Sequence, residues 1–176
     1  MRQPYSMVLF AGAVLHAGAS ISLGQQPNLA TQREAMKKLG FLVGTWSGEA
    51  KVNPGPTEMK LTQTEKVELK LDGTVMLVEG TGRNPSGEIA FQALATIAYD
   101  EATSTYRFRA YSGGRYLDTE LHVSANGFSW GFEGGPTKIT NSMEVNSKGE
   151  WAETTQMTAG NSPPRTLVEM LLHRVP

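Results

Sequence analysis

From residue 44 onward, apolar and polar residues alternate along short stretches that turn-forming residues separate. In the longest stretch, 59–71, Met59, Leu61 and Val67 share one face with further leucines, and lysines occupy the other face. Successive side chains of a β-strand point to opposite faces, so this spacing predicts strands. The pattern predicts about ten of them, over residues 45–52, 59–71, 74–82, 89–100, 106–111, 116–123, 128–132, 138–145, 150–157 and 165–174.

The connections between these stretches are tight turns, of which Asn53-Pro54-Gly55-Pro56 and Asp72-Gly73 are examples. No second helix is long enough to join parallel strands, so consecutive hairpins predict an up-and-down meander. An open sheet of this size would expose two edges, and closing it into a barrel removes them. We therefore predict an all-β fold, a closed antiparallel up-and-down β-barrel, with a β-sandwich as the main alternative.

A short helix is predicted before the first strand. Thr31 and Glu34 have the spacing of a capping box, and Met36 and Leu39 share one helical face. Gly40 is the residue expected just after the end of this helix. A helix of this length is not stable alone, so its apolar side must dock on the barrel.

The first two dozen residues differ in composition from the rest of the chain. Arg2 is followed by a short apolar run, and Ala17-Gly18-Ala19 supplies the small residues of a cleavage site. This is the organisation of a secretory signal peptide, and the run is too short for a convincing membrane span. The alternative is a buried N-terminal helix. We expect a leader over 1–24, cleaved after Ala19 or after Gly24, and one barrel domain over 25–176. The mature protein is then expected in the periplasm or outside the cell, without stable membrane insertion.

The composition limits the chemistry that the chain can perform. It has 176 residues, no cysteine and a formal net charge of -1. Without cysteine there is no disulfide, thiolate metal site or cysteine nucleophile. Without a basic field, no nucleic-acid partner is expected. Gly127-Phe128-Ser129-Trp130-Gly131 matches the G-x-S-x-G pattern, but it lies within an alternating strand and lacks the strand–turn–helix context of a hydrolase nucleophile.

Polar residues interrupt the inward apolar rows of several predicted strands. Gln63 and Glu65 fall in the middle of the row that contains Leu61 and Val67. The same position is taken in later strands by Thr119, Asn141, Glu153 and Glu169. A filled core has little reason to hold polar groups, because each one costs free energy unless it is hydrogen-bonded. The rows therefore predict an interior with apolar ends and a polar middle that holds water or a ligand. The alternative is that bulges shift the register and turn some of these groups outward.

Three short segments resemble a bacterial family of lipocalin-like proteins of unknown function. They are Phe41–Gly48, Ile97–Asp100 and Tyr106. In that family a leucine-rich Gly-x-Trp opens the barrel and a Tyr-Asp pair ends a middle strand. In lipocalins proper the tryptophan closes one barrel end beneath a late arginine. The resemblance implies structural roles for Gly44 and Trp46, with Arg174 above the tryptophan ring, a contact that is favourable in itself.

The related nitrobindins are ten-stranded barrels that also open with Gly-x-Trp, and they hold haem through a histidine toward the chain end. By this resemblance His173 is a candidate haem ligand. The Gly-x-Gly-x-Tyr-Pro continuation of nitrobindins is replaced here by Gly48-Glu49-Ala50-Lys51-Val52, which separates this chain from that pattern. No other cofactor and no metal is expected, because no motif for one is present.

The sequence favours a protein that binds a small, at least partly apolar molecule in the barrel. The residues expected to line or plug the interior are Trp46, Gln63, Glu65, Phe91, Tyr99, Phe108 and Trp130. Two other functions stay open. One is a barrel enzyme that uses Glu65 or Glu153 as general acid or base, and the other is a structural or interaction module with a filled barrel. No motif specifies the ligand or the oligomeric state.

Overall fold

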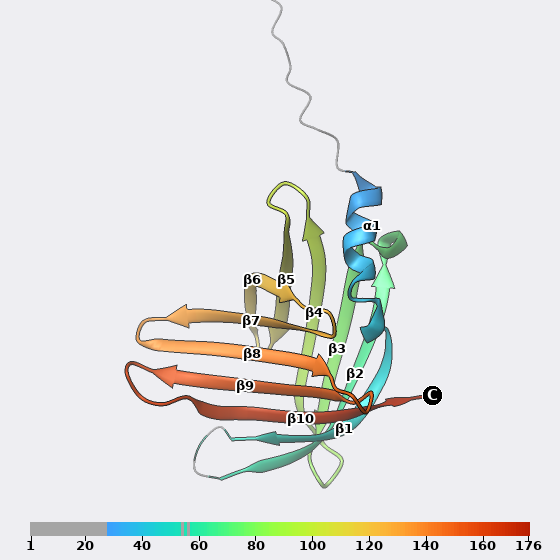
Figure 1. Ribbon diagram of the computed structural model, residues 1–176. Coiled ribbons are helices and arrows are strands. Elements are labelled where there is room, and N and C mark those ends of the chain that lie inside the picture. Colours follow the sequence, from blue (N-terminus) through green and yellow to red (C-terminus); the bar gives the residue numbers. More distant parts are fainter. Residues whose placement is uncertain (1–27, 54, 56) are drawn as a thin grey trace, which may run out of the picture.

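The computed structural model describes residues 28–53, 55 and 57–176, in which one helix and two 3₁₀ turns accompany ten strands (Figure 1). Helix α1 covers Leu29–Lys37, and the turns η1 and η2 cover Gly40–Leu42 and Leu71–Gly73. The strands are β1 (Gly44–Val52), β2 (Met59–Lys70), β3 (Val75–Arg83), β4 (Ile89–Asp100), β5 (Thr105–Ser112), β6 (Arg115–Val123), β7 (Gly127–Gly134), β8 (Thr137–Val145), β9 (Trp151–Ala159) and β10 (Arg165–Val175). Every predicted strand is present, and the predicted leader lies outside the described residues.

The strands form a closed antiparallel barrel in which each strand pairs with its neighbours in sequence and β1 pairs with β10. The closing ladder runs from Thr45 opposite Val175 to Val52 opposite Val168. In Figure 1, strands β2–β5 run along the molecule and β7–β10 run across them, with β1 curving between the two groups. The prediction of a closed barrel is confirmed, and the sandwich alternative is wrong.

Closure requires β1 and β10 to approach closely at Gly48. A Cβ atom built on this residue would overlap the carbonyl oxygen of Leu171 and lie 2.8 Å from Cα of Leu172. Both of these are backbone atoms, which cannot move aside as a side chain can. Glycine is therefore required where β1 curves against β10.

The wall of the barrel has one weakly paired line, between β6 and β7. These strands share only three residue pairs, Leu121–Trp130, His122–Ser129 and Val123–Phe128. Beyond this ladder, the Thr119 hydroxyl donates a hydrogen bond of 2.8 Å to the carbonyl oxygen of Gly131. We refer to this line between β6 and β7 as the seam.

Helix α1 and turn η1 cover one end of the barrel, which we call the closed end. Met36, Leu39 and Leu42 are fully buried there. Trp46 is 1% exposed, and its Nε1 donates a hydrogen bond of 2.8 Å to the carbonyl oxygen of Leu42. Its ring packs edge-on against Trp151, with 5.6 Å between ring centres. The opposite end, where the turn between β1 and β2 lies, is called the open end.

The short helix is confirmed, but its predicted ends are wrong. Asn28 is the N-cap, and its side-chain oxygen accepts hydrogen bonds of 3.0 and 3.3 Å from the backbone N–H groups of Ala30 and Thr31. Thr31 therefore lies inside the helix and forms no capping box. Gly40 does not end the helix in a left-handed conformation, because it begins the 3₁₀ turn η1 instead.

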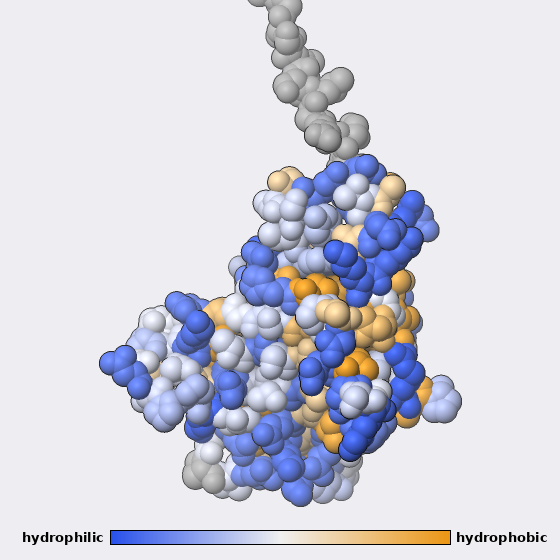
Figure 2. Space-filling view, in the orientation of Figure 1, coloured by the Kyte–Doolittle hydropathy of each residue, from blue (hydrophilic) through white to orange (hydrophobic). Residues whose placement is uncertain are grey.

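The outer surface on the side of α1 is mostly hydrophilic. Figure 2 shows hydrophobic atoms there in small separate areas below the helix, surrounded by hydrophilic ones. Scattered exposed apolar side chains of this kind are normal on a protein surface. Within the described part of the chain, no helix has the length and apolar character needed to cross a membrane.

Candidate functional site

Polar side chains from three strands meet in the barrel interior. Gln63 and Glu65 of β2 are 2% and 7% exposed, and Nε2 of Gln63 donates a hydrogen bond of 2.7 Å to Oε1 of Glu65. On the other side, Nδ2 of Asn141 donates to Oε1 of Glu153 at 2.7 Å and to Oγ1 of Thr155 at 2.9 Å. The interior therefore contains two carboxyl groups and two amides, which we call the polar cluster.

Two glycines on β3 make room for the β2 side chains. Gly80 lies opposite Glu65 and Gly82 lies opposite Gln63 in the ladder. A Cβ atom on Gly80 would lie 2.8 Å from Oε1 of Glu65, and one on Gly82 would lie 2.7 Å from Oε1 of Gln63. The polar side chains of β2 thus lie over β3 in space that a larger residue would fill.

The two carboxyl groups of the cluster resist ionisation. Burial, and to a lesser extent the negative charge of Glu153, raise the pKa of Glu65 to about 8 against the opposing effect of the hydrogen bond from Gln63. Burial also raises the pKa of Glu153, against the hydrogen bonds that it accepts from Asn141 and Trp151. At neutral pH Glu65 is therefore mostly a protonated acid, which can donate a hydrogen bond or a proton.

One polar atom of the cluster has no partner. Oδ1 of Asn141 is buried and receives no hydrogen bond, although the residue is only 2% exposed. Glu153 accepts a second hydrogen bond of 2.8 Å from Nε1 of Trp151, and it keeps some accessible surface although it faces inward. Its strand neighbours Ala152 and Thr154 point to the opposite face. An unsatisfied hydrogen-bond acceptor, Oδ1 of Asn141, therefore lies beside an inward-facing carboxyl group.

An aromatic wall stands next to this acceptor. Trp130 of β7 is the cross-strand neighbour of Asn141, on the same inward face. The ring of Phe108 stacks on Trp130 with 5.4 Å between centres, and the ring of Phe132 stacks on it at 6.5 Å (interplanar angles 20° and 5°). Trp130 is half-buried, so part of its surface faces the interior.

Inward-facing side chains become more exposed to solvent toward the open end. Phe91 and Phe132 are 40% and 44% exposed. Leu117, Ile139 and Met157 are half-buried, although they share the inward face with buried residues of the same strands. The rim of the barrel at this end is therefore accessible to solvent, with no helix of the described chain over it as at the closed end.

The predicted site residues lie in three places in the barrel. Gln63 and Glu65 lie in the polar cluster, and Phe108 and Trp130 form the aromatic wall beside it. Phe91 lies apart, near the open end.

The other predicted residues lie at the closed end. The Arg174 guanidinium is 4.2 Å from the ring centre of Trp46, and it donates hydrogen bonds to the carbonyl oxygens of Phe41, at 2.7 Å, and Val43. Tyr99 packs edge-on against Tyr106, outside the polar cluster, and lines a groove beneath α1. Gly44 has a φ of 131°, and a Cβ atom there would lie 2.6 Å from the Arg174 side chain.

The inward position predicted for Glu169 is wrong. A bulge between Thr166 and Val168 shifts the register of β10, and Glu169 pairs with the outward-facing Thr154 and is exposed. Strand alternation did place Asn141 and Glu153 correctly. Thr155 was not singled out by the sequence, although it shares the inward parity of Glu153.

The residues of the interior do not fit a haem held through His173. This residue lies on the outer face of β10, its side chain is 62% exposed, and its Nδ1 is 3.7 Å from Oε1 of Glu150. An imidazole in that position does not point into the barrel. Among the described residues, no group of three His, Cys, Asp or Glu side chains is placed to hold a metal ion.

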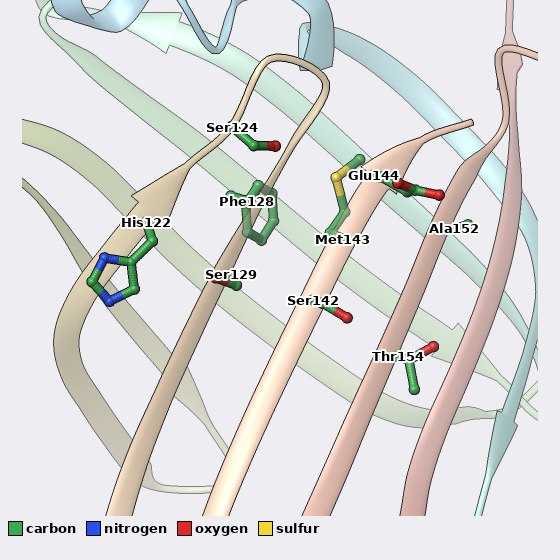
Figure 3. Close-up of a pocket in the computed structure, with 9 residues that line it drawn as sticks. All are labelled: His122, Ser124, Phe128, Ser129, Ser142, Met143, Glu144, Ala152 and Thr154. Atoms are coloured by element: carbon green, nitrogen blue, oxygen red, sulfur yellow. The ribbon is translucent and has the colours of Figure 1, made fainter. Parts of the chain in front are cut away.

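A shallow groove of about 350 Å³ crosses the outer wall over β6–β9 (Figure 3). His122, Ser129, Ser142 and Thr154 follow one another across these strands as cross-strand neighbours. Ser129 lies in the middle of β7, without the turn and helix of a nucleophile elbow. The G-x-S-x-G match therefore does not mark a hydrolase site.

The fold and the interior together define a class: a closed, ten-stranded antiparallel barrel that is covered at one end, open at the other, and polar inside. The chain belongs to the family described as "Protein of unknown function (DUF1579)", whose model matches residues 31–174. It is also similar to the crystal structure of Rv2717c from M. tuberculosis, with a TM-score of 0.60 and 12% identity over 81% of this chain and 98% of that one. At this identity the likeness supports the fold alone. A comparison with curated protein sequences gave no significant match.

Proposed function

We propose that this protein is an exported, lipocalin-like binding protein that holds a small, partly apolar molecule inside its barrel. The ligand's apolar part packs against the aromatic wall of Phe108, Trp130 and Phe132, and its polar part reaches the polar cluster. Ligand sites of this kind are mostly apolar cavities with a few convergent polar groups.

The observation that carries the proposal is the unpartnered Oδ1 of Asn141 beside the inward-facing carboxyl group of Glu153. A buried acceptor without a donor costs about 1–3 kcal/mol, so it is seldom kept without a reason. A bound molecule that donates a hydrogen bond removes this cost.

Co-purification tests the proposal directly. The protein, produced in its native host from the full gene and purified without detergent, is analysed by native mass spectrometry, and the ligand mass is read after denaturation. We expect a bound small molecule in the wild type and its loss in a Gln63→Leu/Glu65→Leu variant that keeps its far-ultraviolet circular dichroism. A wild type that carries no small molecule, together with a double variant that is more stable to unfolding, would favour a filled structural module.

Export is tested on the same preparation. We expect the mature protein in the periplasmic or secreted fraction, with an N-terminus after Ala19 or Gly24. Recovery of the chain in the cytoplasm with an intact N-terminus would contradict this part of the proposal.

The raised pKa of Glu65 supports a second candidate, a barrel enzyme in which this residue acts as general acid. In that case the molecule that co-purifies is a substrate or product. An enzyme would convert this molecule, and the conversion would be lost in a Glu65→Gln variant with intact fold. A binding protein would leave the molecule chemically unchanged, both as wild type and as the Glu65→Gln variant.

A further inference from the structure

The interior contains acidic groups without a basic partner. Glu65 and Glu153 are the acidic residues on the inward rows of the described strands. The basic residues on those rows are Arg174 at the closed end and Arg115 and Arg165 at the rim of the open end, and all three are exposed. No cation of the described chain therefore lies among the acidic groups of the interior.

Around Asn141 and Glu153, the free hydrogen-bonding capacity of the interior consists of acceptors. Both N–H groups of the Asn141 amide are used, toward Glu153 and Thr155, whereas Oδ1 has no partner. The two oxygens of Glu153 accept one hydrogen bond each and retain further lone pairs. A ligand that satisfies this site must bring N–H or O–H donors.

An aromatic face lies beside these acceptors. Trp130 is the cross-strand neighbour of Asn141 and is half-buried. A cation near the face of a tryptophan ring is attracted by the ring's quadrupole. A carboxyl group, a free acceptor and an aromatic face therefore lie on adjoining strands, β9, β8 and β7.

We propose that the polar cluster binds a primary or secondary ammonium group carried on an apolar body, with N–H donors to Asn141 Oδ1 and Glu153 and the cation beside Trp130. This inference rests on the proposed function and names the ligand class of that same site. A carboxylate ligand such as a fatty acid would instead meet two carboxyl groups and an acceptor that it cannot satisfy, which disfavours its binding.

Ammonium binding has a second expected signature, the release of a proton. Because burial raises the pKa of Glu65 to about 8, this carboxyl is mostly protonated at pH 7.5. A cation in the interior favours the ionised form, so binding expels the proton. The neighbours in register of the two carboxyl-bearing residues do not titrate: they are Trp46, Gly80, Met143 and Met170.

The test uses three probes with the same apolar body: octylamine, octanol and octanoate. Their binding to the purified protein is measured by isothermal titration calorimetry at pH 7.5, in two buffers of different ionisation enthalpy. We expect octylamine to bind about 10- to 100-fold more tightly than octanol, as for a charge-assisted hydrogen bond. Octanoate should bind more weakly than either, and proton release should accompany octylamine alone.

A matched pair of variants links the preference to the site. Glu153→Gln should abolish the preference for octylamine while octanol still binds. Glu169→Gln removes the same charge from the exposed face of the adjacent strand and should change nothing. Thermal unfolding of both variants, followed by circular dichroism, shows whether the barrel is intact.

Failure of the ammonium inference and failure of the proposed function give different results. Octanol or octanoate binding as tightly as octylamine overturns the ammonium inference and leaves interior binding standing. A preference for octylamine that Glu169→Gln abolishes as fully as Glu153→Gln overturns it as well, because bulk charge then explains the effect. If none of the three probes binds, the ammonium inference fails, and the co-purification experiment decides separately whether the proposed function survives.

Discussion

Replacing Glu65 by Gln is expected to stabilise the barrel at neutral and alkaline pH and to have little effect at acid pH. The ordinary pKa of this carboxyl is 4.5, and burial raises it to about 8 in the folded protein. Between these two values the folded protein keeps a proton that the unfolded chain has lost. Raising the pH across this window therefore lowers the free energy of unfolding of the wild type. Glutamine has no proton to lose, so the variant escapes this effect.

The size of this stabilisation follows from the shift in the pKa of Glu65. At about 1.4 kcal/mol for each tenfold change in the proton-binding constant, the shift corresponds to at most about 5 kcal/mol over the whole window. Because Glu153 titrates in the same interior, we expect about 2–4 kcal/mol of stabilisation for Glu65→Gln at pH 8, falling toward zero near pH 4.5. The substitution keeps the oxygen that accepts the hydrogen bond from Gln63, so packing is little disturbed.

The measurement is urea unfolding at about pH 4.5, 6 and 8, values that cover the window between the two pKa values. Unfolding is followed by tryptophan fluorescence and circular dichroism. Glu169→Gln, an exposed carboxyl on β10, serves as the control and should follow the wild type at every pH. The reasoning is refuted if the difference between Glu65→Gln and wild type does not change with pH, or if it grows toward acid pH.

Three other substitutions test the geometry of the barrel. Arg174→Ala removes two hydrogen bonds to backbone carbonyls and the contact with the tryptophan plug, and should lower the free energy of urea unfolding by about 1–3 kcal/mol; no loss would contradict its role at the closed end. Gly80→Ala should cost about 1–3 kcal/mol by crowding Glu65, and most of this cost should vanish in a Glu65→Ala background. An undiminished cost there would argue against crowding. Gly48→Ala meets the backbone of β10 and should cost more than about 3 kcal/mol, so soluble, cooperatively unfolding protein would count against the close approach.

The barrel could be predicted from the sequence because its strands alternate strictly and are separated by strong turns. Alternation is a local property, so it placed Gln63, Glu65, Asn141 and Glu153 on the inward face without knowledge of the rest of the fold. It failed at Glu169, where a bulge in β10 changes the register, and no residue type marks that bulge in the sequence.

The distribution of the site over the barrel could not be predicted in the same way. Tyr99 shares the inward parity of Ile97, but the docked helix makes it part of the closed end. Phe91 lies near the open end. Alternation does not predict this, because the position of a residue along the barrel axis depends on strand tilt and stagger. These features are set by contacts between distant segments, which alternation within one strand does not record.

The seam between β6 and β7 also bears on how the chain folds. Unrolled along that line, the barrel becomes a ten-stranded sheet with β6 and β7 at its two rims and β1 beside β10 at its centre. The rim strands are consecutive in the chain, whereas the central pair joins the first strand of the barrel to its last, from Thr45 opposite Val175 to Val52 opposite Val168. Bringing such distant segments together carries the largest entropy cost, so the meeting of the two chain ends should limit the refolding rate. Deleting β10 would then leave one edge of β1 and one edge of β9 unpaired near the middle of the sheet and prevent closure altogether, a far greater loss than the removal of one strand from a rim.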